Sequence, residues 1–230
     1  MKQICLLVLA AALASMLAAQ SFTGDADMTV EQSYLQESVE LIIIREQSRL
    51  NSREAKLSAL EYIAAAINRG SKSDEIRASL EYLALEGVVN VARENGRVVN
   101  NFPDIRKQAA AWLGKLGTPE AKTTLLKMIG ADNDPQVIAE ALKSICLIGN
   151  SDDNEINLIA RTVSRFHNLY PDNMVVLSAL DIFEKTAAAN NGLRDRFAIE
   201  TITLISESRY YVSSVRNRAK LLLEDLKKYR

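Results

Sequence analysis

The sequence predicts an all-α protein, an α-solenoid (α-α superhelix) of about five antiparallel helix pairs. Three observations support this fold class. The composition favours helix over strand, with 48% hydrophobic residues, 6% aromatic residues and only 4 prolines in 230 residues. Helix stop and start signals recur at short intervals. A residue frame also repeats at a spacing typical of helical repeat proteins.

Residues 1–19 have the pattern of a secretory signal peptide. Lys2 precedes an apolar run that begins at Ile4, and small residues follow up to Ala19. The run is too short for a comfortable bilayer crossing, so we expect no integral membrane span after cleavage. Residues 20–230 are then expected to form a single helical-repeat domain of a periplasmic or secreted protein.

Charge and cysteine content restrict what the processed chain can be. Removal of residues 1–19 leaves 27 basic against 29 acidic side chains, a net charge of −2. This balance opposes nucleic-acid binding, which needs a basic surface. Only Cys146 remains, so no intramolecular disulfide can form. Helix packing must hold the fold together.

The helices are predicted in order from their apolar periodicity and their boundary signals. Arg69-Gly70-Ser71, Asn95-Gly96 and Asn190-Asn191-Gly192 are helix stops, while Thr118-Pro119 and Asp134-Pro135 are N-cap and first-turn pairs. The expected helices are 29–49, 53–69, 73–94, 103–117, 119–130, 135–149, 152–168, 172–190, 193–207 and 211–229.

The segment "AAAWLGKLGTPEA", residues 109–121, contains the spacing Gly-x-x-Gly. Such a loop can clamp a nucleic-acid backbone in one RNA-binding module, but glycine also ends helices. Because no strands are expected nearby, we interpret Gly114 as a site of close helix approach and Gly117 as a helix end. The helix before Gly117 has a broad apolar face that needs a neighbour, made of Ile105, Ala109, Trp112, Leu113 and Leu116.

The repeat frame consists of an acidic opener, a β-branched residue, alanine four places later, an apolar pair and glycine. It occurs in residues 104–134 and again in 134–163, with Gly117 and Gly149 closing the helices. The first half recurs twice more along the chain. The paired anchors are Ile105 with Ala109, Val137 with Ala141, Val175 with Ala179, and Val215 with Ala219, at spacings of 32, 38 and 40 residues.

The stretch "RKQAAAWLGKLGTPEAKTTLLKMIGADNDPQVIAEALKSICLIGN" resembles the HEAT-repeat family over about residues 104–165. The likeness is to the short bacterial type that is also found in phycobilisome-lyase-like proteins. Arg106 matches the family pattern, whereas Ile138 stands where the family has arginine after valine. The resemblance implies antiparallel helix pairs stacked into a curved array, whose second helices line a concave binding face. It does not imply a reaction.

The segment "ENGRVVNNFPD", residues 94–104, is the longest irregular piece and interrupts the repeat. It is either a joint between two parts of the array, at about residues 95–103, or a functional loop. The sequence favours the joint.

No catalytic, cofactor-binding or metal-binding residues are predicted. His167 is the one histidine and lies near a helix end, where an imidazole is structurally favourable, while Cys146 belongs to an apolar stripe. Asp132 and Asp134 begin a calcium-loop spacing, but Lys143 stands where the bidentate glutamate is needed. We interpret Asp134, and "NSDDNEI" at 150–156, as helix caps.

Basic residues gather at the C-terminal end. Residues 209–230 carry a net charge of +5, with 7 basic against 2 acidic side chains, and could meet an acidic partner or form the polar face of a terminal repeat. On the second helices, the resemblance points to four cations as partner-binding candidates, which are Lys127, Arg161, Arg165 and Arg196.

The leading functional hypothesis is a protein-binding or scaffolding module in the cell envelope, without catalysis, whose partner is an envelope or secreted protein. The alternative is a lyase-like or other enzyme with a pocket on the concave face. A nucleic-acid-binding array is disfavoured by the export signal and the charge. The sequence leaves the oligomeric state open.

Overall fold

The structure is a computed structural model that describes residues 30–229. Contacts between Cα atoms divide the chain into two compact units, Met1–Ser38 and Val39–Arg230. The predicted signal peptide lies outside the described residues, and of the first unit only residues 30–38 are described, as part of one helix. The account below concerns the second unit.

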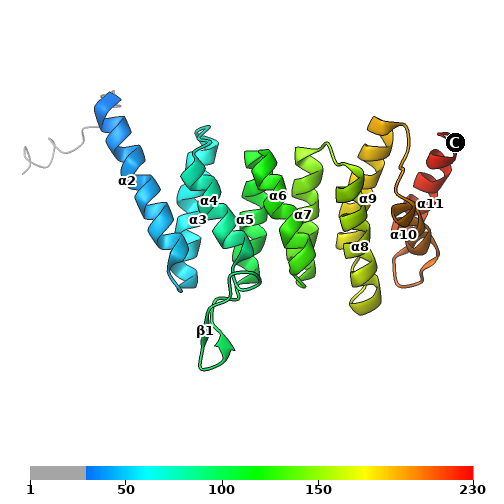
Figure 1. The fold of residues 1–230 in the computed structure, drawn as a ribbon, viewed down its shortest axis with the longest axis horizontal. Helices are drawn as coiled ribbons and strands as arrows, with labels where there is room; N and C mark the ends of the chain where they lie inside the picture. Colours follow the sequence, from blue (N-terminus) through cyan, green and yellow to red (C-terminus); the bar gives the residue numbers. More distant parts are fainter. Residues whose placement is uncertain (1–29, 230) are drawn as a thin grey trace, which may run out of the picture. The chain divides into compact units, whose positions relative to one another are not determined.

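The described residues form ten helices and one short hairpin, so the all-α prediction is confirmed (Figure 1). Nine of the ten predicted helices agree with the structure within about three residues at each end. The elements are α2 (Val30–Arg49), α3 (Arg53–Asn68), α4 (Asp74–Leu85), β1 (Arg93–Glu94), β2 (Arg97–Val98), α5 (Pro103–Leu116), α6 (Pro119–Ala131), α7 (Pro135–Ile148), α8 (Asp153–Leu169), α9 (Asn173–Asn190), α10 (Arg196–Glu207) and α11 (Ser213–Lys227).

The helix starts are set by local side-chain caps. Thr118 accepts a hydrogen bond from the N–H of Ala121, 3.2 Å away. Asp134 accepts from two amides at the start of α7, and Asp152 forms a reciprocal capping box with Glu155. These contacts confirm that Asp134 and the acidic segment 150–156 cap helices.

The helices contact one another in two interleaved series. α3 packs against α5, α5 against α7, α7 against α9 and α9 against α11, while α4 packs against α6, α6 against α8 and α8 against α10. Consecutive helices such as α5 and α6, or α10 and α11, also contact each other. Each helix from α4 to α11 therefore contacts neighbours in its own series and in the other one.

The close helix approach that the sequence predicts at Gly114 lies between α5 and α7. Ile105, Ala109 and Leu113 are completely buried on the predicted face, and Trp112 is half-buried. A Cβ atom built on Gly114 would lie 2.6 Å from both Cβ and Oγ of Ser144. The interpretation of Gly114 as a site of close approach is thereby confirmed. Gly117 follows α5 with a φ of 71°, which also confirms its role as a helix end.

One predicted helix is wrong in its second half. The sequence predicts helix over 73–94, but α4 ends at Leu85, and residues 86–102 form a loop that contains β1 and β2. Asn95 and Gly96 both have positive φ, at 49° and 79°, which is the geometry of a tight hairpin turn and not of a helix end. The strand-favouring residues Val91 and Val98 flank this turn.

Candidate functional site

The hairpin between α4 and α5 extends away from the helices (Figure 1). β1 and β2 pair antiparallel, with Arg93 opposite Val98 and Glu94 opposite Arg97. All four of these side chains are exposed. Val89 and Val91 are also exposed at the base of the hairpin. The hairpin therefore offers solvent a mixture of valines, two arginines and Glu94 that no described helix covers.

Asn100 closes the base of this loop. Its side chain is buried; Oδ1 accepts a hydrogen bond of 2.9 Å from the N–H of Ala92, and Nδ2 donates one of 2.8 Å to the carbonyl of Asn90. Gly87, at a φ of +73°, lies so close that a Cβ atom there would stand 2.5 Å from the carbonyl oxygen of Asn100. The two ends of the loop are thus joined by direct contacts.

A buried ion pair lies beneath the loop. Lys56 Nζ is 2.8 Å from Glu86 Oε1, and the two side chains are 0% and 2% exposed. Lys56 also donates to the carbonyl of Ser48, at 3.0 Å, and Asn100 Nδ2 lies 3.4 Å from Glu86 Oε1. Among the described residues, Glu86 Oε2 is buried without a hydrogen-bond partner. Taking both charges out of water is costly, so the pair fixes where the loop starts more than it stabilises the fold.

The charges of this ion pair lie close to the ring of Tyr82. Lys56 Nζ lies 5.7 Å from the centre of the Tyr82 ring. Burial, and next the charge of Glu86, raise the pKa of the Tyr82 phenol, while Arg49 opposes the shift.

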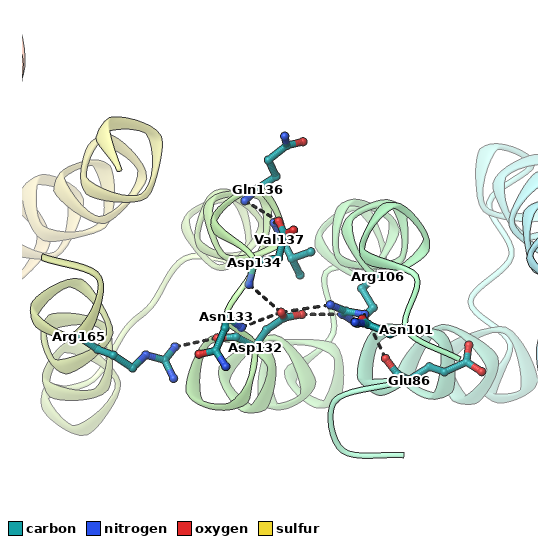
Figure 2. Close-up of polar contacts among 9 residues, drawn as sticks. All are labelled: Glu86, Asn101, Arg106, Asp132, Asn133, Asp134, Gln136, Val137 and Arg165. Carbon is teal, nitrogen blue, oxygen red and sulfur yellow. Dashed lines mark hydrogen bonds and ion pairs between the residues drawn. The ribbon is translucent and has the colours of Figure 1, made fainter. Parts of the chain in front are cut away.

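A second buried ion pair connects the loop to the turn between α6 and α7 (Figure 2). Arg106 donates from Nε to Asp132 Oδ2 at 2.6 Å and from Nη2 to Oδ1 at 3.2 Å, and both side chains are 3% exposed. Arg106 Nη1 donates to Asn101 Oδ1 at 2.8 Å and to the carbonyl of Glu86 at 3.4 Å. The guanidinium of Arg106 therefore contacts both ends of the hairpin loop and the turn between α6 and α7.

Asp132 is fully used in this arrangement. Its Oδ1 also accepts hydrogen bonds from the backbone N–H groups of Asn133 and Asp134, at 2.8 and 3.0 Å (Figure 2). The carboxylate thus organises the turn before α7.

In the described part of the chain, no three His, Cys, Asp or Glu side chains are grouped so that they could hold a metal ion.

Arg165, one of the four partner-binding candidates, binds backbone carbonyls at the end of α6. Its Nη2 donates to the carbonyls of Ile129 and Asp132, each at 2.9 Å, and its Nη1 donates to Gly130 at 3.1 Å. These carbonyls are ones that a helix end leaves unpaired. Burial lowers the pKa of Arg165, and the charge of Asp132 opposes that shift. Much of this guanidinium is therefore occupied within the chain.

The other three candidates are exposed. Arg161 donates to Asn157 Oδ1 at 2.7 Å, and its guanidinium carbon lies 5.4 Å from the centre of the Phe197 ring. Arg196, next to Phe197, has a 92% exposed side chain and is 2.8 Å from Glu200. Lys127 lies on α6. The structure thus brings Arg161 of α8 against the start of α10, and places all four candidates on α6, α8 and α10.

His167 and Cys146 lie in separate surroundings. His167 Nδ1 is 3.1 Å from the hydroxyl of Tyr211, and the rings of Tyr210 and Tyr211 both lie 5.7 Å from the imidazole. Burial, with the charge of Asp172 adding to it, raises the pKa of Tyr211 to about 12. Cys146 is buried in α7.

The basic C-terminal helix is partly neutralised by its neighbour. Arg218 of α11 forms ion pairs with Asp181 and Glu184 of α9. The hydrogen bonds that Arg218 donates to Glu184 raise the pKa of Arg218, burial opposes this rise, and the hydrogen bond to Asp181 adds to it. Within residues 30–229, no helix combines the length and apolar character that crossing a bilayer requires.

No protein-family model matches this chain, and no curated protein matches it either. Among solved structures, it is similar to a de novo designed 16-helix transmembrane nanopore determined by cryo-EM. That match has 16% sequence identity and a TM-score of 0.25, and it covers 85% of this chain and 62% of the designed one. At this TM-score, the likeness indicates neither the fold nor the function of the chain.

The hairpin network is the part of the site that sequence reasoning missed. The pair Asn95-Gly96 between strand-favouring valines is a hairpin signal, but it also fits a helix stop. Nothing local in the sequence pairs Glu86 with Lys56 or Arg106 with Asp132.

Proposed function

We propose that this chain is an exported HEAT-like α-solenoid that binds or scaffolds another protein of the cell envelope, without catalysis. The proposal is supported by the repeat frame of residues 104–163, by the two series of helix contacts and by the signal-peptide pattern of residues 1–19. Arrays of this kind offer a long surface made of stacked helices, and their binding rests on a few anchors.

The observation that carries the proposal is that buried contacts fix both ends of the exposed hairpin. Two buried ion pairs, Lys56 with Glu86 and Arg106 with Asp132, are costly ways to stabilise a fold, yet both act on the loop that presents the hairpin. A loop that is already ordered loses little conformational entropy when it binds. Valines beside arginines are suited to an apolar contact rimmed by acidic groups on a partner.

The cations on α6, α8 and α10 form a second part of the proposed interface. Lys127, Arg161 and Arg196 are exposed, and in a HEAT-like array these helices line the concave face. Arg165 contributes mainly by fixing the end of α6. We expect the hairpin to give the anchor contacts and these cations to tune association through charge.

A crosslinking experiment tests the proposal. A photoreactive residue at Val98 is introduced into the full chain, crosslinked partners are identified by mass spectrometry in the cell envelope, and the captured protein is purified for binding assays. We expect Arg93→Glu with Arg97→Glu to weaken binding more than tenfold without changing the thermal unfolding midpoint. Lys72→Glu with Lys220→Glu, which reverses two exposed charges whose side chains form no ion pair among the described residues, is the matched control.

Two results would contradict the proposal. In the first, the hairpin variant and the control bind the captured protein equally well. In the second, fractionation and N-terminal sequencing find the chain unprocessed in the cytoplasm, which would remove an envelope partner from consideration.

A further inference from the structure

A cavity of about 530 Å³ lies near the C-terminal end of the described chain. Its walls come from the turn between α9 and α10, from α10 itself and from α11. The volume falls in the range of about 300 to 1,000 Å³ that is usual for ligand-binding clefts. Its lining shares no residue with the hairpin site, so it would constitute a separate surface.

The turn that forms one wall is held in a defined shape. Asn191 and Gly192 have φ values of 54° and 124°, and the N–H of Gly192 donates to the carbonyl of Ala187 at 2.8 Å. A Cβ atom on Gly192 would lie 3.3 Å from Cβ of Tyr229. Because this position is glycine, the tyrosine can lie directly against the turn.

The floor of the cavity is apolar. Ile199 of α10 and Leu223 of α11 are half-buried, and Leu226 is 8% exposed. Thr203 also lines the cavity, and its hydroxyl donates to the carbonyl of Ile199 at 2.9 Å. Apolar side chains that stay partly open to solvent gain free energy when an apolar group covers them, at about 25 cal/mol per Å².

The charged groups at the rim are all cations. Arg194 and Lys227 line the cavity, both are exposed, and within residues 30–229 neither side chain forms an ion pair or a hydrogen bond. No described residue of the lining is acidic. By contrast, Arg218 and Lys228 of the same C-terminal segment are paired with carboxylates. Two unpaired cations above an apolar floor complement an anion that carries an apolar group.

We propose that this cavity binds an acidic peptide segment of a partner protein. The carboxylates of the segment pair with Arg194 and Lys227, and an apolar side chain between them covers Ile199 and Leu223. Asn190 and Asn191 at the rim supply amide donors and acceptors for the backbone of the peptide. The site goes beyond the proposed function of the hairpin, because it would bind a second segment at a different place.

Fluorescence anisotropy tests this with the full chain and a fluorescein-labelled hexapeptide of alternating glutamate and leucine. We expect saturable binding that weakens as salt rises. Arg194→Glu with Lys227→Glu should weaken it at least tenfold, and Leu223→Ser at least threefold. The matched control is Arg209→Glu with Lys220→Glu, which reverses two exposed charges outside the cavity and should change affinity less than twofold.

Three outcomes overturn the inference. The first is the absence of saturable binding by the unaltered chain, whose fold is checked by circular dichroism. In the second, the control loses as much affinity as the cavity variant, which would indicate a general basic surface. The third is self-association in sedimentation that only the cavity variant abolishes, which would make a second copy the occupant. Peptide binding that survives Arg93→Glu with Arg97→Glu separates this site from the hairpin.

Discussion

Arg106 and Asp132 form a buried two-point ion pair that joins the hairpin loop to the turn between α6 and α7. The pair connects segments that are far apart in sequence, and the same guanidinium reaches the carbonyl of Glu86 and the side chain of Asn101. The position of the hairpin therefore depends on a contact that is made outside the loop itself.

Arg106→Ala should destabilise the protein strongly. The change leaves the Asp132 carboxylate buried without its cation, and breaking a buried pair in this way costs about 3 to 5 kcal/mol. The measurement is the free energy of unfolding from urea denaturation. Arg53→Ala is the control, because its pair with Asp104 is about half exposed and should contribute less than about 1 kcal/mol. Equal losses for the two variants would show that the Arg106 contact is not desolvated.

Asn100→Ala should loosen the hairpin without unfolding the helices. The variant loses the acceptor for the N–H of Ala92 and the donor to the carbonyl of Asn90. We expect faster amide hydrogen exchange over residues 88–99 and unchanged exchange in α7 and α9. Asn95→Gly, at the turn of the hairpin where φ is 49°, should leave exchange at the base as it was. Unchanged exchange in Asn100→Ala would mean that other contacts hold the base.

Gly114→Ala should destabilise the contact between α5 and α7. The added methyl group would meet Ser144 Cβ at 2.6 Å and Ser144 Cα at 3.0 Å, and overpacking of this kind costs about 1 to 3 kcal/mol. Gly130→Ala is the matched control in α6, because a Cβ atom there meets nothing within 4 Å. Thermal unfolding should separate the two variants, and Ser144→Gly should partly rescue Gly114→Ala. A stable Gly114→Ala without that second change would argue against the close approach.

Stability should fall at high pH through Tyr211. Burial raises the pKa of its phenol from the usual 10.0 to about 12, so the folded state holds the proton more tightly than the unfolded state does. This contribution is fully present below pH 10 and is lost as the pH rises through 12, with a size of about 2 to 3 kcal/mol. Urea denaturation between pH 9 and pH 12 should show a steeper loss in the unaltered protein than in Tyr211→Phe. Parallel curves would contradict this assignment.

The helix starts could be predicted because capping is local. Thr118, Asp134 and Asp152 each bind an amide two or three residues ahead, so the pattern lies within one turn of the chain. Gly114 and Gly117 could be interpreted for the same reason, since no strand signal stood near them. These short-range rules were enough to predict an all-α fold.

The hairpin network depends on contacts between distant residues, which such rules do not reach. α4 ends at Leu85, the next residue Glu86 pairs with Lys56, and no pattern within the segment 73–94 contains that partner. Arg165 was expected on an open surface, but α8 packs on α6 and brings it to the carbonyls at the end of that helix. In both cases a buried partner outside the segment decided where the side chain lies.

The attachment of the hairpin also determines how a force on its tip would reach the helices. The two ends of the hairpin pass Glu86 and Asn101: Glu86 pairs with Lys56 of α3, and Arg106 of α5 donates to both ends. A force on the tip would therefore act directly on buried ion pairs, because no flexible linker lies between the hairpin and these contacts. Tension applied there would be transmitted into the helices on both sides before the loop could extend.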